Sequence, residues 1–204
     1  DVTDGKITID GKDIRNVSQH ELREKLGYVP QKAVLFSGDI ASNILYGNPD
    51  GSEAEMTEAA TIAQATEFIE QKKKKYKSTI SQGGSNVSGG QKQRLSIARA
   101  IAKHPDVYIF DDSFSALDYK TDATLRAKLK EKTSESTVMI VAQRISTILH
   151  ADQIIVLDDG QIVGKGTHKE LLKNCEAYYQ IASSQLSENE LEEDLKEVES
   201  YAKR

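Results

Sequence analysis

The sequence predicts an α/β fold in which a parallel sheet with flanking helices is interrupted by a mainly helical segment. Residues 107–110 form an apolar run that ends in Asp111 and Asp112, which is typical of a buried parallel strand. A helix that begins after Ser88 precedes this run, and strands alternate with helices after it. With 204 residues, 38% of them apolar, the chain is long enough to bury one substantial core.

The N-terminal part is expected to form short strands and one short helix. Residues 6–10 alternate as a strand does and end in an Asp-Gly turn. Ser18 and Glu21 have the spacing of a capping box, which predicts a helix that runs to about residue 26. Residues 28–31 then indicate a buried strand that leads into a loop.

Residues 39–103 are predicted to form a helical subdomain. A short helix is expected at residues 37–46, and a second capping box at Ser52 predicts a helix to about residue 71. The helix after Ser88 runs to about residue 103, where the Pro at position 105 stops it.

From residue 107 onward the chain alternates again between strands and helices. Residues 158–160 read Asp-Asp-Gly, which predicts a hairpin into residues 161–165. Thr167 with Glu170 caps one more helix. The other elements are a helix at 120–132 and strands at 107–112, 137–142 and 153–158.

The chain is interpreted as one domain over residues 1–183, followed by an acidic helical tail over residues 184–204. The tail carries seven carboxylates against three basic side chains. A solvated helix is the default interpretation of the tail, and a regulatory or dimer contact is the alternative. The net charge of −5 argues against a nucleic-acid partner. No stretch approaches the roughly 18 to 20 apolar residues of a membrane span.

The start of the helix at residue 88 is a candidate phosphate site. Ser88 is a good N-cap, and Gly89 and Gly90 leave the backbone N–H groups accessible because they carry no Cβ. A helix N-terminus presents unpaired N–H donors and a partial positive charge, which suits a phosphate. Taken alone, the run is explained by a capped helix after a Gly-rich turn, with no ligand.

The two carboxylates after the strand at residues 107–110 are candidate metal and water ligands. Open α/β sheets place their ligands at the carboxyl ends of the strands. Asp111 would hold the Mg²⁺ of a nucleotide through water, because Mg²⁺ keeps much of its hydration shell. Asp112 would orient or deprotonate an attacking water. The alternative for this element alone is a buried strand with a capping aspartate.

Together these elements resemble the nucleotide-binding domain of ATP-binding cassette (ABC) exporters of the multidrug and lipid type. The resemblance covers about residues 1–183 and rests on five motifs in the family's order. They are the Q-loop Tyr28-Val29-Pro30-Gln31, the signature Val87-Ser88-Gly89-Gly90-Gln91-Lys92-Gln93-Arg94, the Walker B strand Val107-Tyr108-Ile109-Phe110-Asp111-Asp112, the D-loop Ser115-Ala116-Leu117-Asp118 and the switch Val141-Ala142-Gln143-Arg144. The segment Thr79–Asn86 resembles the run that leads into the signature.

The resemblance implies a P-loop NTPase-like ABC ATPase core, with ATP and Mg²⁺ as cofactors. Asp112 and Gln143 would be the catalytic residues, and Asp111 and Gln31 would bind the metal ion. The nucleotide would be bound by Gln31, Ser88, Gly89, Gly90, Gln91 and Asp118. Asp118 is also placed to cap the following helix, and both roles are compatible.

Two positions depart from the family's pattern. Hydrolytic members usually carry Glu where this chain has Asp112, which is one methylene shorter. They usually carry His where it has Gln143, and Gln cannot accept a full proton. The signature departs only in Val87, which replaces Leu and stays apolar. We therefore expect a subunit with a slow ATP site of its own that lends a competent signature to its partner. Neutral drift within an active homodimer is the alternative.

The resemblance also implies partners and a location. Domains of this family dimerise head to tail, here with a different subunit, and contact a transmembrane domain through coupling helices at the cytoplasmic face of the membrane. No Gly-x-x-x-x-Gly-Lys-Ser/Thr run occurs, so we expect a chain cut after the Walker A helix, lacking the strands before it and inactive alone. An ABC ATPase without a membrane domain and a catalytically silent regulatory subunit are the alternative functions.

Overall fold

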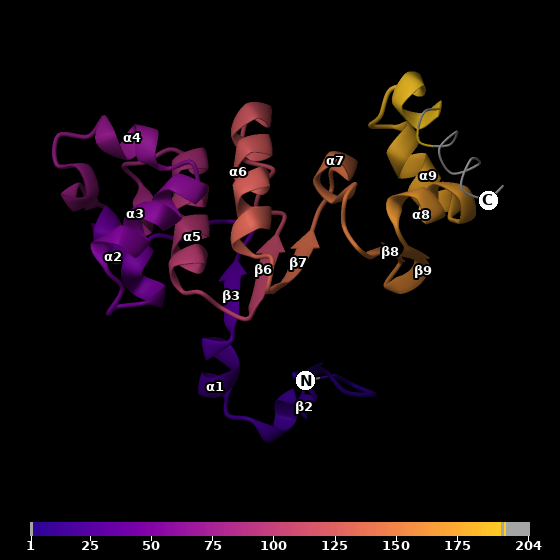
Figure 1. Ribbon diagram of the computed structural model, residues 1–204, viewed down its shortest axis with the longest axis horizontal. Helices are drawn as coiled ribbons and strands as arrows, with labels where there is room; N and C mark the ends of the chain where they lie inside the picture. The colour runs from indigo at the N-terminus through magenta and orange to yellow at the C-terminus, as the bar shows by residue number, and fades with distance from the viewer. Residues whose placement is uncertain (1, 193, 195–204) are drawn as a thin grey trace. The chain divides into compact units, whose positions relative to one another are not determined.

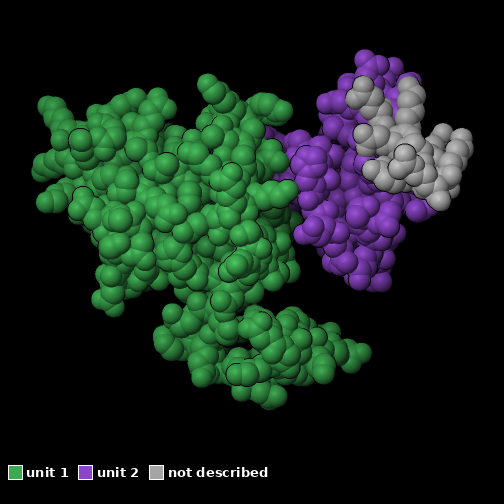
Figure 2. Space-filling model, in the orientation of Figure 1, with its two compact units in different colours: residues 1–141 green, residues 142–204 purple. Residues whose placement is uncertain are grey.

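The computed structural model describes residues 2–192 and residue 194. The chain divides into two compact units, residues 1–141 and 142–204, which Figure 2 shows in different colours. Each unit has its own cluster of buried apolar side chains.

The first unit is built on a three-stranded parallel sheet (Figure 1). The strands are β3 (Leu26–Val29), β6 (Val107–Asp111) and β7 (Thr137–Val141), with β6 in the middle. Phe110 on β6 lies opposite Val29 on β3 and Ile140 on β7. The prediction of a parallel strand that ends at the two carboxylates is confirmed.

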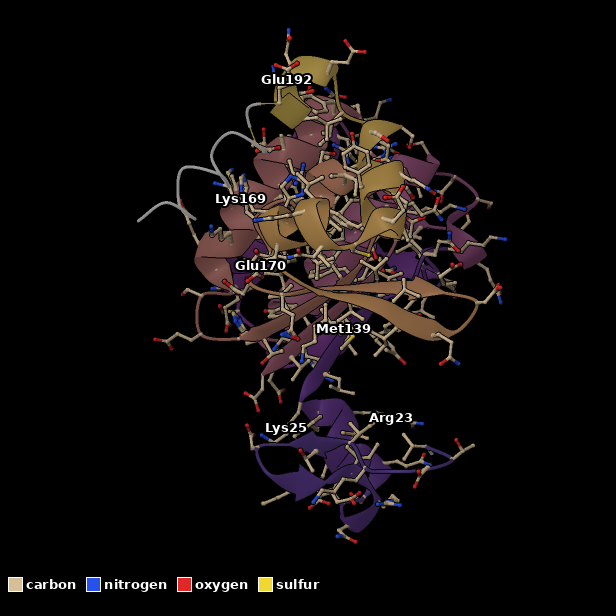
Figure 3. All side chains as sticks on the ribbon, turned by 90° about the vertical axis from the view of Figure 1, so that its right-hand side faces the viewer. Arg23, Lys25, Met139, Lys169, Glu170 and Glu192 are labelled. Carbon is tan, nitrogen blue, oxygen red and sulfur yellow. The ribbon has the colours of Figure 1, made fainter. Side chains whose placement is uncertain are left out.

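The two faces of this sheet differ in burial. Tyr108 and Phe110 are buried in one core with side chains of α5 (Gly89–Ala102) and α6 (Tyr119–Lys132). The other face is open, because Tyr28 is 55% exposed and Met139, labelled in Figure 3, is 56% exposed. The strand expected at residues 28–31 was predicted to be buried, and this holds for Val29 but not for Tyr28.

The segment predicted as a helical subdomain contains α2 (Ile40–Ile44), α3 (Glu53–Ile62) and α4 (Thr66–Glu70) before α5. The single helix expected over residues 52–71 was wrong. Gln64 has a left-handed φ of 56°, and its side-chain amide donates to the carbonyl of Thr61 at 2.9 Å, so the helix ends and restarts. The segment also includes a two-stranded antiparallel sheet of β4 (Gly38–Asp39) and β5 (Thr79–Ile80).

The N-terminal residues form a small hairpin of β1 (Thr8–Ile9) and β2 (Lys12–Asp13), shorter than the strand expected at residues 6–10. Helix α1 (Gln19–Glu24) has the predicted capping box but ends before residue 26, because Leu26 already pairs in β3. Four short 3₁₀ helices complete the unit: η1 (Ile14–Asn16), η2 (Leu45–Gly47), η3 (Lys75–Lys77) and η4 (Gln82–Gly84).

The second unit contains α7 (Ile145–Ile148), the hairpin of β8 (Ile154–Asp158) and β9 (Gln161–Gly166), and helices α8 (His168–Asn174) and α9 (Glu176–Ser183). The predicted Asp-Gly hairpin is confirmed: Asp159 and Gly160 have φ values of 44° and 75°, as a type I′ turn requires. The predicted capping box of α8 is present, with Glu170 visible in Figure 3.

The start of the predicted acidic tail is helical at residues 188–192 and 194, and Ser187 caps this helix together with Glu190. Residues 193 and 195–204 of the tail lie outside the described residues. Among the residues that the structure describes, no helix is both long enough and apolar enough to cross a bilayer.

Candidate functional site

The signature segment forms the capped N-terminus of α5. The Ser88 hydroxyl accepts the N–H of Gln91 at 3.2 Å, and the Gln91 side chain accepts the N–H of Ser88 at 3.2 Å. The first four N–H groups of a helix lack intrahelical acceptors. Two of them are satisfied by this reciprocal pair, namely the N–H groups of Ser88 and Gln91, and the remaining two belong to Gly89 and Gly90.

The same segment is open to solvent. Ser88 and Gly89 are exposed, and a Cβ added at Gly89 would meet no atom within 4 Å. The Ser88 hydroxyl accepts in the cap and so keeps its own proton for another acceptor. This geometry offers two backbone donors and one hydroxyl donor to an anion that approaches from outside.

A second group of side chains lies at the carboxyl ends of β3 and β6. The Gln31 amide nitrogen donates to the Asp112 carboxylate at 3.1 Å, and the Tyr28 hydroxyl donates to the Asp111 carboxylate at 3.1 Å. The bond to Asp111 raises the pKa of Tyr28 above its ordinary value. The structure thus brings three predicted residues together at the predicted sheet edge, namely Gln31, Asp111 and Asp112.

Asp112 has an unusual backbone conformation. Its φ of 42° lies in the left-handed region, which non-glycine residues seldom occupy and Asp tolerates better than most. Its N–H donates to the carbonyl of Val141 at 2.9 Å, which holds the turn after β6 against the end of β7. The backbone of Asp112 is therefore held to β7, while its carboxylate accepts from Gln31 after β3.

Ser113 is a positioning residue that the sequence analysis missed. Its hydroxyl is fully buried and donates to the carbonyl of Val29 at 2.8 Å, with the carbonyl of Asp111 at 3.3 Å. It therefore fixes the end of β6 relative to the end of β3, where Gln31 follows. A serine directly after a pair of strand-end carboxylates was the only available signal.

The D-loop lies next to the start of α5. A Cβ added at Gly90 would be 3.4 Å from the carbonyl oxygen of Ala116. Asp118 caps α6 by accepting the N–H of Thr121 at 3.0 Å, as predicted, and its bonds to Thr121 lower the pKa of its carboxyl. No hydrogen bond within the described part of the first unit links Ser88–Gln91 to Gln31, Asp111 or Asp112.

Gln143 belongs to the second unit and is described within that unit. Its side chain is exposed, and its carbonyl accepts from the Gln185 amide at 2.9 Å. The Gln185 side-chain oxygen also accepts the N–H of Ile145 at 2.9 Å. Gln185 thus braces the backbone around Gln143, a role that the sequence did not indicate.

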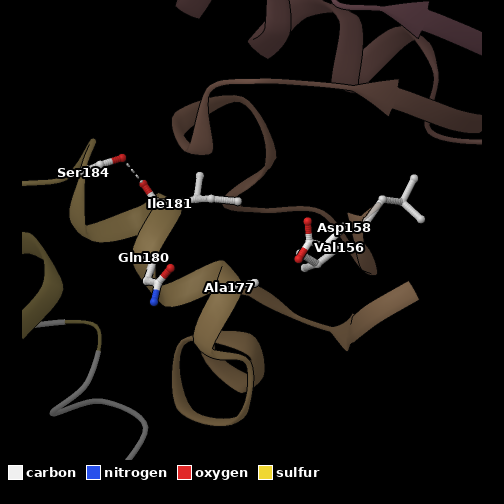
Figure 4. A pocket seen from close by; sticks show the side chains of 7 residues that line it. Val156, Asp158, Ala177, Gln180, Ile181 and Ser184 are labelled. Atoms are coloured by element: carbon white, nitrogen blue, oxygen red, sulfur yellow. Dashed lines mark hydrogen bonds between the residues drawn. The ribbon is translucent and has the colours of Figure 1, made fainter. Parts of the chain in front are cut away.

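The hollows of the surface do not coincide with these residues. One, of about 350 Å³ and shown in Figure 4, lies between β8 and α9, where the Ser184 hydroxyl donates to the carbonyl of Ile181 at 2.7 Å. Another, of about 400 Å³, lies beside the N-terminal hairpin. The candidate site residues instead lie at the ends of β3 and β6 and at the start of α5, outside these two hollows.

A parallel sheet whose central strand ends in two carboxylates, together with a Gly-rich capped helix, is typical of α/β nucleotide-binding folds. The sequence pattern of the family described as "ABC transporter" matches residues 1–115. The chain belongs to the ABC transporter family, and its fold is that of an α/β ABC ATPase domain.

Similar proteins span a much longer sequence. An uncharacterized ABC transporter ATP-binding protein of Mycobacterium tuberculosis is 46% identical over 188 residues, which are 91% of this chain and 32% of that protein. A Staphylococcus aureus protein whose name suggests multidrug export is 42% identical over 185 residues, 91% and 32% of the two lengths. A solved bacterial Atm1-family ABC exporter with ATP bound superposes with a TM-score of 0.88 at 39% identity, covering 92% of this chain and 33% of that one. The chain spans about a third of these relatives' length.

Proposed function

We propose that this chain is the ATP-binding and ATP-hydrolysing domain of a membrane exporter, located at the cytoplasmic face of the membrane. ATP-driven closure of a head-to-tail dimer would power export. Membership of the ABC family and the likeness to an exporter solved with ATP bound support this proposal. Within the pair, this chain would be the subunit with the slow site, and its partner would be a different subunit.

Two features carry the proposal. The signature is exposed and has a complete capping box, and the carboxylate of Asp112 at the sheet edge is shorter than that of a glutamate. Ser88, Gly89 and Gly90 present their donors outward, so a phosphate held by a second subunit has access to them. Gln31 and Asp112, which are hydrogen-bonded to each other, would belong to the chain's own site, whereas the signature would serve the site of the partner.

The chain's own site is expected to hydrolyse ATP slowly. Asp112 is one methylene shorter than Glu, which displaces a bound water by about an ångström and costs roughly a hundredfold in rate. Gln143 donates and accepts hydrogen bonds but cannot take a full proton, as an imidazole can. Both departures weaken the activation of water and leave nucleotide binding possible.

The residues present fit a Mg²⁺ ion that accompanies the nucleotide. Mg²⁺ prefers carboxylate, carbonyl and water oxygens. Asp111 supplies a carboxylate, one oxygen of which Tyr28 contacts, and Gln31 supplies an amide oxygen because its nitrogen is bound to Asp112. The ion would neutralise phosphate charge, while these side chains orient it and its waters. Asp118 would link the two ATP sites through the D-loop, and the loop after Gln31 would face the transmembrane domain.

The test is ATP turnover by the complete gene product, alone and reconstituted with a second ABC subunit, beside the same pair carrying Asp112→Glu and Gln143→His. We expect little turnover alone, robust turnover in the pair, and a second hydrolysing site in the restored variant. The 204-residue chain alone serves as a background and is expected to be inactive.

Each outcome decides a separate part of the proposal. Strong turnover by this subunit alone would contradict the slow site and favour an active homodimer. No turnover in any pair would contradict the ATPase function. An unchanged rate after restoration of both residues would refute the account that rests on Asp112 and Gln143.

A further inference from the structure

The switch residue Gln143 is followed by a short helix that takes its cap from a distant side chain. Helix α7 begins at Ile145, and its N-cap residue Arg144 makes no side-chain cap hydrogen bond. The N–H of Ile145 instead donates to the side-chain oxygen of Gln185, forty residues later in the chain, at 2.9 Å. Gln185 therefore satisfies a backbone donor that the start of a helix otherwise leaves unpaired.

The same side chain also holds the peptide group on the other side of Arg144. The amide nitrogen of Gln185 donates to the carbonyl of Gln143 at 2.9 Å. One planar amide thus donates to one peptide group and accepts from the next, which a carboxylate cannot do because it lacks a donor. Both contacts are to backbone atoms, so they do not depend on which side chain stands at position 143.

The backbone of Gln185 is itself anchored at the end of α9. Its N–H donates to the carbonyl of Ala182 at 3.0 Å, and the N–H of Leu186 donates to the same carbonyl at 2.8 Å. Ala182 is fully buried, and Leu186 packs against the apolar cluster of the second unit. The position of Gln185 is therefore fixed on the side of α9.

The described part of the acidic tail anchors the chain on the other side of Gln185. The helix that Ser187 caps carries Leu191, which is only 8% exposed and belongs to the same apolar cluster. One turn later, the carboxylate of Asp194 lies 3.1 Å from Nε2 of the buried His168. Gln185 is thus held between two docked segments.

His168 gives the tail a specific docking point. A carboxylate only accepts hydrogen bonds, so Nε2 donates to Asp194, and Nδ1 of the neutral ring accepts the hydroxyl proton of Tyr178 at 2.8 Å. The two rings also meet edge to face, with their centres 5.7 Å apart. Both ring nitrogens have partners, so the docked tail leaves no buried polar atom of His168 unsatisfied.

We propose that Gln185 is a positioning residue for the switch of this chain's own ATP site, and that the docked acidic tail keeps it in place. This inference rests on the proposed function, in which Gln143 occupies the switch. A tail that left His168 would hold Gln185 on the side of α9 only. The tail therefore acts on the activation of water through Gln185 and the backbone of Gln143.

The test uses the complete reconstituted pair that carries Asp112→Glu and Gln143→His. The turnover that this restoration adds belongs to the chain's own site and is the quantity measured. Gln185→Met keeps the length of the side chain and removes its donor and its acceptor. We expect the added kcat to fall about ten- to a hundredfold, as for a misplaced catalytic group, with the KM for ATP within about twofold. Gln180→Met, at an exposed position of α9 labelled in Figure 4, is the matched control and should change neither.

Amide hydrogen exchange, followed by mass spectrometry in the same pair, gives a second measurement that does not depend on turnover. We expect residues 142–149 to exchange about fivefold faster in the Gln185→Met variant, the effect of losing one helix cap. The Gln180→Met control should leave this exchange unchanged.

A third comparison tests the part played by the tail. Leu191→Ser combined with Asp194→Ala removes both docking contacts, and it should lower the added turnover at least about twofold. The combination should have no further effect once Gln185→Met is present, because the tail acts through Gln185. Glu188→Ala, at an exposed position of the same helix, is the control and should change nothing.

The outcomes separate this inference from the proposed function. No added turnover after restoration contradicts the proposed function, whereas added turnover that Gln185→Met leaves intact overturns the positioning role alone, even if exchange becomes faster. Unchanged exchange also overturns it, and unchanged turnover after removal of the docking contacts overturns the role of the tail. If Gln185→Met does not yield folded protein, Gln185→Glu, which keeps the acceptor for Ile145 and loses the donor to Gln143, is judged by the same criteria.

Discussion

Replacing Ser113 by alanine should destabilise the first unit more than its size suggests. The hydroxyl is fully buried, and its oxygen lies 2.8 Å from the carbonyl oxygen of Val29 and 3.3 Å from that of Asp111. The variant therefore loses one good hydrogen bond and leaves a buried carbonyl with one partner fewer. Such a loss costs about 1–3 kcal/mol in the free energy of unfolding.

Urea unfolding followed by circular dichroism measures this cost, with Ser115→Ala as the control. The Ser115 hydroxyl donates to the carbonyl of Asp112 at 2.9 Å, but Ser115 is exposed, so water replaces the lost contact. We expect the control to lie within about 0.5 kcal/mol of the parent. Equal losses for the two variants would refute the argument that burial sets the cost.

Four further expectations follow from the geometry. Gly89→Ala should leave the unfolding midpoint unchanged, because the added Cβ would meet no atom within 4 Å. The same variant should lower ATP turnover of the reconstituted pair about a hundredfold, because the Cβ displaces the phosphate. Normal turnover would exclude a phosphate contact. Phe110→Ala should lower the free energy of unfolding by about 3–5 kcal/mol, measured by thermal or urea unfolding, because Phe110 is buried. Tyr28→Ala, on the open face, should lower it by less than about 1 kcal/mol. Similar losses for the two variants would contradict the assigned packing. NMR titration of Glu170 should give a pKa below its ordinary 4.5, because it accepts the N–H and hydroxyl of its cap residue; the resulting stability is present above the unfolded pKa and lost as the pH falls through the folded one. Burial raises the pKa of Tyr178 to about 12, so the phenolate of Tyr178, followed by NMR, should form only near that pH, and the associated stability is lost as the pH rises through it.

Short sequence patterns predicted helix starts and strands correctly where the structure depends on residues close together in the chain. Ser18, Ser52 and Thr167 each form the predicted capping box, because the motif depends on residues three apart. The strand at residues 107–111 followed from its apolar run and its two terminal carboxylates. The placement of Gln31 at the metal site with Asp111 was implied by the resemblance, whereas its hydrogen bond to Asp112 was not predicted.

Features set by distant contacts were not predictable in the same way. The break at Gln64 depends on a left-handed backbone whose carbonyl accepts from Arg94 at 2.7 Å, thirty residues away. The open face of the sheet could not be foreseen, because Tyr28 and Met139 belong to apolar strands whichever face is covered. Ser113 and Gln185 act through carbonyls of other elements, and neither stands in a recognisable pattern.

The left-handed backbone at Asp112 makes the choice between a short and a long carboxylate unequal. Short polar side chains form local hydrogen bonds that offset this conformation, and longer ones gain less from them. A change from Asp to Glu at this position therefore makes the left-handed backbone less favourable, and it brings the carboxylate nearer to a water molecule. Asp at this position therefore favours the backbone conformation of the turn, and its shorter side chain is the accompanying cost.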